Sequence, residues 1–197
     1  MRPAAVAAVA AALLIAACAD DGRALREPVP GATAPAVPTT TAPGQATVVA
    51  PLALTSTAFG PGEAIPLEHT CDGADVSPPL AWGSIPQATV ELAITVTDTD
   101  ADGFVHWVVA GLDATVQALA IGVVSDGAVQ AKNGGGTPGW MGPCPPPQAG
   151  IHHYVFTLYA LTAASGVTAN MSGEDAIAAI ANVPGLTATL IATYQRA

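Results

Sequence analysis

Residues 153–161 read HYVFTLYAL, and this stretch predicts a β-strand. Valine, threonine and aromatic residues favour the pleated strand conformation. Successive side chains along a strand face opposite sides of its sheet. His152 is therefore expected to share a side with Tyr154 and Phe156, whereas His153 faces the other way.

Other segments with the same composition predict further strands, separated by glycine and proline, at residues 52–59, 90–98, 104–111 and 186–194. Strict alternation in residues 104–111 directs His106 to the same side as Phe104 and Val108. One segment has a helical pattern, SGEDAIAAIAN at residues 172–182, in which Ser172 can cap the N-terminus. The order of elements predicts a mainly antiparallel β domain with one or two peripheral helices.

Composition limits the chain to one domain and excludes some partners. The 197 residues are 51% hydrophobic and 10% charged, which suffices for one core of about 100–150 residues. Fifteen acidic and five basic residues give a formal charge of −10. Because this charge repels phosphate backbones, nucleic acid is not an expected partner.

Residues 1–17 have the pattern of a secretory signal peptide, with Arg2 before an apolar run too short to span a bilayer. The run ends in LIAAC, which resembles a bacterial lipobox with Cys18 as the acylated residue. An ordinary signal peptide with an incidental cysteine is the alternative. Acylation by more than one chain, palmitate included, would hold the protein stably at the cell membrane, on its extracytoplasmic side. Removing residues 1–17 takes away one cation and changes the formal charge from −10 to −11.

A tether is predicted between this cysteine and the folded domain, at residues 18–50. The part PVPGATAPAVPTTTAPGQAT, residues 28–47, has five prolines and no bulky side chain. Such a composition favours an extended, partly polyproline-like chain. The folded domain is then expected at residues 51–197.

Two cysteines remain after Cys18, namely Cys71 and Cys144. In an exported protein an even pair favours a disulfide, although spacing alone leaves two free thiols open. A bond between them would pin two proline-rich loops together.

Three segments carry a resemblance to a known family: CDGADVSPPLAW (71–82), TDTDADGFVHWVV (97–109) and GWMGPCPPPQAGIHHYVFTLYAL (139–161). In this order and spacing they resemble the phosphatidylethanolamine-binding protein family, in particular its bacterial Raf-kinase-inhibitor-like branch. The resemblance extends from about residue 52 to the end of the chain. It implies two packed β-sheets and a pocket for phosphate or a phosphorylated head group.

Carried over by position, the resemblance assigns seven residues to ligand binding: Asp98, Asp100, His106, Gly142, Pro143, His152 and Tyr154. The stretch from Gly142 to Pro146 would form one wall. This chain departs from the family pattern at residues 98–102, where two prolines are absent and Asp102 adds an acid. A carboxylate that orients an imidazole would leave N–H groups directed at a phosphate oxygen.

The plainer alternatives are structural. His106 would be a core histidine bonded to a carbonyl group, and Asp98 and Asp100 would end a strand and shape a turn. No cofactor, metal site or catalytic residue is expected, because adjacent histidines on a strand diverge and no nucleophile elbow is present. The sequence therefore predicts a membrane-anchored protein that binds a small anion or phospholipid head group. A protein inhibitor or adaptor that acts on a protease or kinase through surface loops is the alternative.

Overall fold

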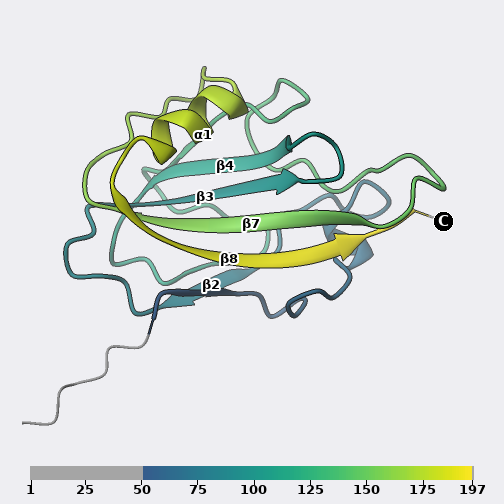
Figure 1. Cartoon of the computed structure of the whole chain (residues 1–197), viewed down its shortest axis with the longest axis horizontal. Helices are drawn as coiled ribbons and strands as arrows, with labels where there is room; N and C mark the ends of the chain where they lie inside the picture. The colour runs from purple at the N-terminus through teal and green to yellow at the C-terminus, as the bar shows by residue number, and fades with distance from the viewer. Residues whose placement is uncertain (1–50, 197) are drawn as a thin grey trace, which may run out of the picture. The chain divides into compact units, whose positions relative to one another are not determined.

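The computed structural model describes residues 51–196, which form two antiparallel β-sheets (Figure 1). The smaller sheet has the order β1-β2-β5, with β1 at Ala53–Thr55, β2 at Leu80–Gly83 and β5 at Ala118–Leu119. The larger sheet has the order β6-β4-β3-β7-β8. Its strands are β3 at Glu91–Asp98, β4 at Phe104–Leu112, β6 at Val129–Gln130, β7 at His152–Leu161 and β8 at Gly185–Tyr194. The prediction of a mainly antiparallel β domain is confirmed.

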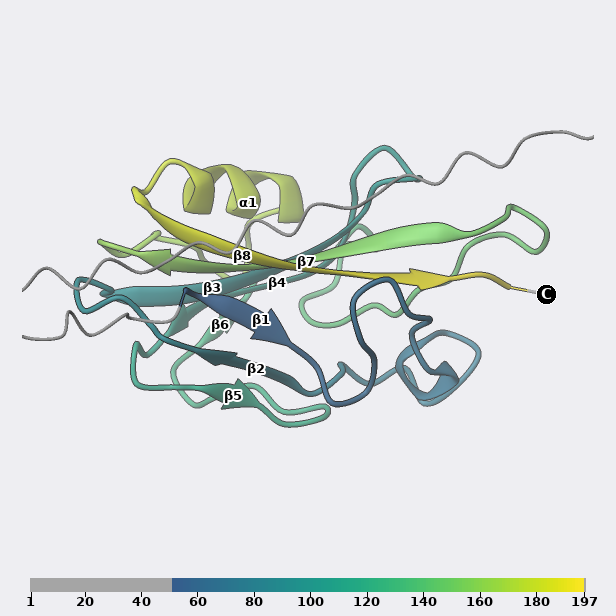
Figure 2. The ribbon, with the colours of Figure 1, turned by 60° about the horizontal axis from the view of Figure 1, so that its bottom comes forward.

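The main hydrophobic core lies between the two sheets, which Figure 2 shows as stacked layers. Trp82 of β2 and Trp107 of β4 belong to it, together with Phe156 of β7. The last of these rings lies 5.4 Å from the ring of Phe59, measured between centroids. Alternate residues of β7 are buried, as the apolar alternation in its sequence predicts.

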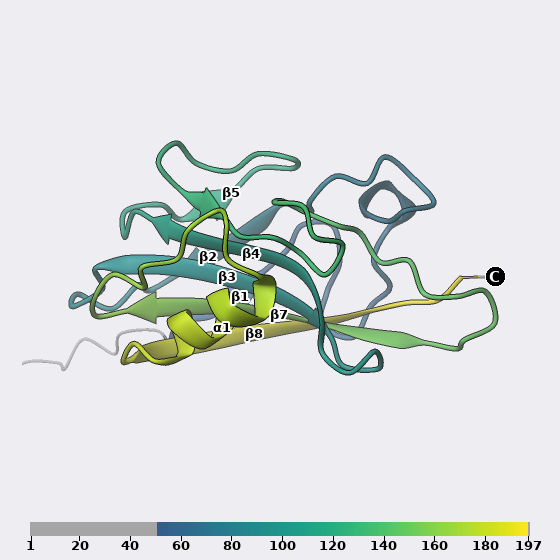
Figure 3. The same ribbon diagram turned by 90° about the horizontal axis from the view of Figure 1, so that it is seen from above.

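The opposite face of the larger sheet is covered by α1, at Gly173–Ala181 (Figure 3). Ala176 and Ile180 of this helix pack against Val105 and Val108 of β4 in a second core. The hydroxyl of Ser172 accepts a hydrogen bond of 3.1 Å from the backbone N–H three residues later, as predicted. A 3₁₀ helix, η1, lies at Leu67–His69. None of the helices within residues 51–196 has the length and apolar character needed to cross a bilayer.

The four long predicted strands match β3, β4, β7 and β8 to within one residue at each end. The strand predicted at residues 52–59 is shorter, because the Ser56 hydroxyl bonds to the carbonyl of Pro79 and receives the N–H of Ala58. The chain bends there instead of continuing the ladder. Three short strands, β2, β5 and β6, were not predicted, since two to four residues carry too little periodicity.

Three segments far apart in the sequence meet at one end of the larger sheet (Figures 2 and 3). They are the η1 segment, the connection from β6 to β7, and the end of β8. This end also carries the β3–β4 turn, whose backbone is held by hydrogen bonds from Gly103 N–H to Asp98 and from Phe104 N–H to Ala101. The turn therefore closes without the two prolines of the family pattern.

Candidate functional site

A cavity of about 170 Å³ opens at this end of the larger sheet. Its lining comes from β3, β4, β7, the β3–β4 turn and the β6–β7 connection, and comprises Asp98, Ala101, Phe104, His106, Met141, Cys144, Pro145, Pro146, His152 and Tyr154. Four of the seven residues assigned to the ligand thus line one cavity: Asp98, His106, His152 and Tyr154.

A buried, hydrogen-bonded pair in the cavity joins Asp98 and His152. In the register of β3 and β7, Asp98 lies opposite Tyr154, two residues beyond His152. The Nδ1 atom of His152 lies 2.7 Å from Oδ2 of Asp98, while Oδ1 of Asp98 accepts the N–H of Asp100 at 2.9 Å. Because both carboxylate oxygens are occupied and Asp98 is only 3% exposed, its position is fixed.

His106 reaches the cavity through a β-bulge. Val96 pairs with Trp107 and Thr97 with Val105, so His106 has no partner on β3. The bulge breaks the alternation along β4. His106 lines the cavity as Phe104 does, whereas Val108 packs in the core under α1. The prediction that His106 and Val108 share a side is therefore wrong.

The His106 ring is fixed by the β6–β7 connection. Its Nδ1 atom donates to the carbonyl of Met141 at 2.6 Å, and Met141 N–H donates back to the carbonyl of His106 at 3.0 Å. Burial lowers the pKa of His106, and the Met141 carbonyl and Asp98 offset only part of this effect. The ring is therefore neutral near pH 7, with Nδ1 protonated and Nε2 available as an acceptor.

Tyr154 supplies a buried hydroxyl that makes no hydrogen bond of good geometry to the described residues, although the Asp98 carboxylate lies near it. Its ring packs edge-on against His106, with 5.1 Å between the centroids. Burial, followed by the nearby Asp98 carboxylate, raises the pKa of Tyr154 well above its ordinary value. The hydroxyl therefore stays protonated and can donate a hydrogen bond to a ligand.

Asp100 does not line the cavity. Its Oδ2 atom instead accepts both the backbone N–H of His153, at 2.7 Å, and the Nδ1 of the same residue, at 2.9 Å. These hydrogen bonds, the side-chain one first, lower the pKa of Asp100. The pair is exposed because His153 faces away from His152.

Gly142 and Pro143 also lie behind the cavity wall rather than on its surface. The N–H of Gly142 donates to Oδ1 of Asp75 at 2.7 Å, and the carbonyl of Pro143 accepts the N–H of Cys71 at 3.2 Å. A side chain on Gly142 would collide with this neighbouring loop, which explains the glycine. The wall itself is formed by Met141, Cys144, Pro145 and Pro146.

Met141 and Phe104 are the lining residues of most consequence that the sequence did not single out. Met141 acts through its backbone carbonyl, which no side-chain pattern reveals. Phe104 also packs edge-on against the His106 ring, with 5.0 Å between the centroids. The only available signal was its position two residues before His106 in a predicted strand.

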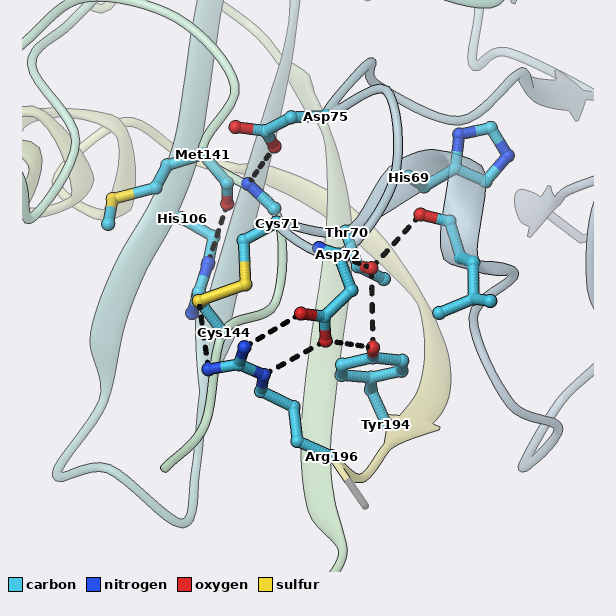
Figure 4. The surroundings of a disulfide bond; sticks show 12 residues. His69, Thr70, Cys71, Asp72, Asp75, His106, Met141, Cys144, Tyr194 and Arg196 are labelled. Carbon is cyan, nitrogen blue, oxygen red and sulfur yellow. Dashed lines mark hydrogen bonds and ion pairs between the residues drawn. A yellow bond between two sulfur atoms is a disulfide. The ribbon is translucent and has the colours of Figure 1, made fainter. Parts of the chain in front are cut away.

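The predicted disulfide between Cys71 and Cys144 is present (Figure 4), with the two Cα atoms 5.5 Å apart. It joins the segment after η1 to the cavity wall. Cys18 lies outside the described residues. Within residues 51–196, no group of three or more histidine, cysteine, aspartate or glutamate side chains is arranged to hold a metal ion.

Comparison with known proteins defines the class. Residues 55–195 match the family model described as phosphatidylethanolamine-binding protein, so the chain belongs to this family. The crystal structure of Escherichia coli YbcL, a member of the family, covers 75% of this chain and 100% of its own, with a TM-score of 0.72 and 31% identity.

Two sequence relatives extend the comparison. A Mycobacterium tuberculosis protein named "Putative lipoprotein LppC" is 40% identical over 146 residues, which cover 73% of this chain and 72% of the relative. An uncharacterised-family protein from Methanothermobacter thermautotrophicus is 38% identical and is covered over 98% of its length. One relative thus carries a lipoprotein name.

Proposed function

We propose that this domain is a non-catalytic binding module whose cavity takes a small anion, such as phosphate or a phosphorylated or carboxylated head group. One observation carries the proposal. The hydroxyl of Tyr154 is buried without a described partner in a cavity that His106 and His152 also line. A buried hydroxyl without a partner costs free energy, and a ligand oxygen would satisfy it.

The charges favour an anion of low charge that carries or brings a proton. The buried Asp98 carboxylate opposes a fully ionised anion, and His152, which binds this carboxylate through Nδ1, leaves its Nε2 for the ligand. The Nε2 of His106 can accept a P–OH proton of a phosphate monoanion. A ligand that retains a proton is therefore favoured over a fully ionised one.

The size and lining of the cavity support a head group rather than a large ligand. Its volume of about 170 Å³ is below the range of roughly 300–1,000 Å³ that is usual for drug-sized ligands. The sulfur of Cys144, which lines the cavity, is held in a disulfide, and the Tyr154 hydroxyl stays protonated. Neither residue therefore supplies a nucleophile.

Membrane anchoring is part of the same proposal. The lipobox-like sequence ending at Cys18 and the lipoprotein name of one relative support a lipid anchor on the extracytoplasmic side. A tether of 32 residues, 19–50, would then separate the anchor from the domain. The anchor would keep the cavity near phospholipid head groups. Action as an inhibitor or adaptor remains an alternative prediction.

Calorimetric titration of the domain with phosphate, phosphoethanolamine and acetate at pH 6.0 tests the anion site. His152→Ala should weaken binding by about tenfold or more, because it removes a charge-assisted hydrogen bond. The neighbouring His153→Ala is the matched control and should change the affinity less than twofold. The proposal fails if none of the three anions binds the intact domain.

A further inference from the structure

The segment at residues 69–75 supports the cavity wall without lining the cavity. It holds the β6–β7 connection at several points. The carbonyl of His69 accepts the indole N–H of Trp140 at 3.2 Å, Asp75 accepts the N–H of Gly142 at 2.7 Å, and the disulfide joins Cys71 to Cys144. The disulfide is the covalent part of this support.

This supporting segment positions part of the proposed anion site. The Met141 carbonyl fixes the protonated nitrogen of His106, and Met141 directly precedes Gly142. Cys144 and the two prolines after it form the wall. Movement of this connection would therefore change both the cavity shape and the hydrogen bond that orients His106.

The end of β8 also holds the supporting segment (Figure 4). Arg196 makes two hydrogen bonds to the Asp72 carboxylate, at 2.9 and 2.8 Å, and Tyr194 donates to the same carboxylate at 2.7 Å. A third nitrogen of Arg196 lies 3.9 Å from the sulfur of Cys144. The disulfide thus lies beside the Arg196–Asp72 ion pair.

We infer that the Cys71–Cys144 disulfide is a redox control of the cavity: the oxidised domain is competent to bind an anion, and reduction by a thiol weakens binding. The inference rests on the proposed function. Both cysteines are exposed, so a thiol can reach them. When the disulfide opens, the β6–β7 connection keeps its noncovalent contacts but adopts the binding-competent arrangement for a smaller fraction of the time. The apparent affinity for the anion decreases in proportion to this fraction.

The chemistry is thiol–disulfide exchange with a small dithiol. A thiolate attacks the sulfur of Cys71, a mixed disulfide forms, and Cys144 leaves as a thiolate, which the Arg196 guanidinium stabilises. The second thiol of the reductant then displaces Cys71. The protein gains two thiols, and the reductant is oxidised to its own disulfide.

The sheet itself does not depend on this bond. Asp98, His152 and Tyr154 stand on adjacent strands of the larger sheet, β3 and β7, which pair over eight residues. We therefore expect the reduced domain to keep this sheet and to lose the fixed position of the β6–β7 connection. The result is a folded protein with a loosened cavity.

Titration of the oxidised domain with inorganic phosphate at pH 6.0, before and after reduction by dithiothreitol, tests the inference. Reduction should weaken phosphate binding by about tenfold, which corresponds to a competent fraction of about one tenth. The Cys71→Ser/Cys144→Ser variant should bind as weakly as the reduced domain and should not respond to dithiothreitol. Backbone amide spectra of β3, β7 and β8 establish that the sheet persists.

The ¹⁵N spectrum of the His106 ring gives a second measurement that does not need a ligand. In the oxidised domain Nδ1 should be the protonated nitrogen, and reduction should mix the two tautomers. If oxidised protein binds no phosphate, the proposed function fails, and this signal still tests whether the disulfide positions His106. Equal affinity and an unchanged tautomer after reduction would overturn the inference.

Asp75→Asn tests the same positioning role without reduction, so the test still applies if the reduced domain unfolds. Asp75 has a φ of 54°, a conformation that asparagine tolerates. In the oxidised protein this change weakens the hydrogen bond to Gly142 and leaves the disulfide intact. It should reduce phosphate affinity about threefold, and an unchanged affinity there would contradict the positioning role.

Discussion

Two aspartate–histidine pairs connect the end of β3 to the start of β7, and they differ mainly in burial. In the first pair, Nδ1 of His152 lies 2.7 Å from Oδ2 of Asp98, and the side chains of Asp98 and His152 are 4% and 10% exposed. In the second pair, Nδ1 of His153 lies 2.9 Å from Oδ2 of Asp100, and the side chains of Asp100 and His153 are 39% and 51% exposed. Because His152 and His153 are consecutive on a strand, they face opposite ways.

The difference shows that burial, not residue type, separates a candidate site from a surface contact. Water screens the exposed pair and solvates either partner alone, so such pairs contribute little. Water does not reach the buried pair, so removal of one partner leaves the other without a hydrogen-bond partner. The same two residue types therefore give one pair that shapes a cavity and one that does not.

The largest effect is expected when the buried pair is broken by Asp98→Asn. Asp98 uses both carboxylate oxygens, one for His152 and one for the N–H of Asp100. Asparagine has a single acceptor oxygen, so one donor would face an NH₂ group. The free energy of unfolding should fall by about 2 kcal/mol, measured by urea denaturation at pH 7.

Asp100→Asn is the matched control for this comparison. One oxygen of Asp100 accepts both hydrogen bonds from His153, and an asparagine oxygen can replace it. The urea midpoint should therefore stay within experimental error. Equal destabilisation by the two changes would show that burial does not distinguish the pairs.

A smaller effect is expected from pH, through the second histidine of the cavity. Burial lowers the pKa of His106 in the folded state, whereas the unfolded chain has an ordinary value of about 6.5. The unfolded state therefore binds more protons below about pH 7, and this destabilises the fold as the pH decreases. The groups that act on His106 from its surroundings are Asp98, Asp75 and His152.

Calorimetry without phosphate, between pH 7.5 and 5.5, measures this dependence. His106→Gln should reduce the loss of Tm on acidification, because glutamine does not titrate in this range. The lowered pKa of Asp100 affects stability only below about pH 4, near the ordinary aspartate pKa, so it lies outside this window. A pH slope that His106→Gln does not alter would contradict the burial of a neutral ring.

Much of the fold could be predicted from the sequence because it depends on local patterns. The alternation in residues 153–161 and the N-cap at Ser172 are both confirmed, since each reflects the geometry of a single element. The pairing of Cys71 with Cys144 needed the extra premise of an exported protein. The short strands β2, β5 and β6 carried no comparable signal.

The candidate site could be predicted only in part, because it depends on irregular backbone. The bulge at His106 leaves no mark on the apolar pattern of β4, so the side shared with Val108 was predicted wrongly. Asp100 follows Asp98 by two residues, yet it bonds to His153 beyond the end of the strand. The contact between Met141 and His106 is made by a carbonyl group, which every residue has.

A smaller change in stability than that of Asp98→Asn is expected from Tyr154→Phe, and its sign should be opposite. Tyr154 lies on the same buried side of β7 as His152, but its hydroxyl has no described partner. Its removal relieves an unsatisfied buried group, so the free energy of unfolding without ligand should rise by up to about 1 kcal/mol. Phosphate affinity should fall about fivefold in the same variant, because the ligand loses a donor.

Tyr159→Phe, on the side of β7 that faces the α1 core, should leave affinity unchanged. A Tyr154→Phe domain that is less stable yet binds phosphate normally would assign the hydroxyl to the fold rather than to the ligand.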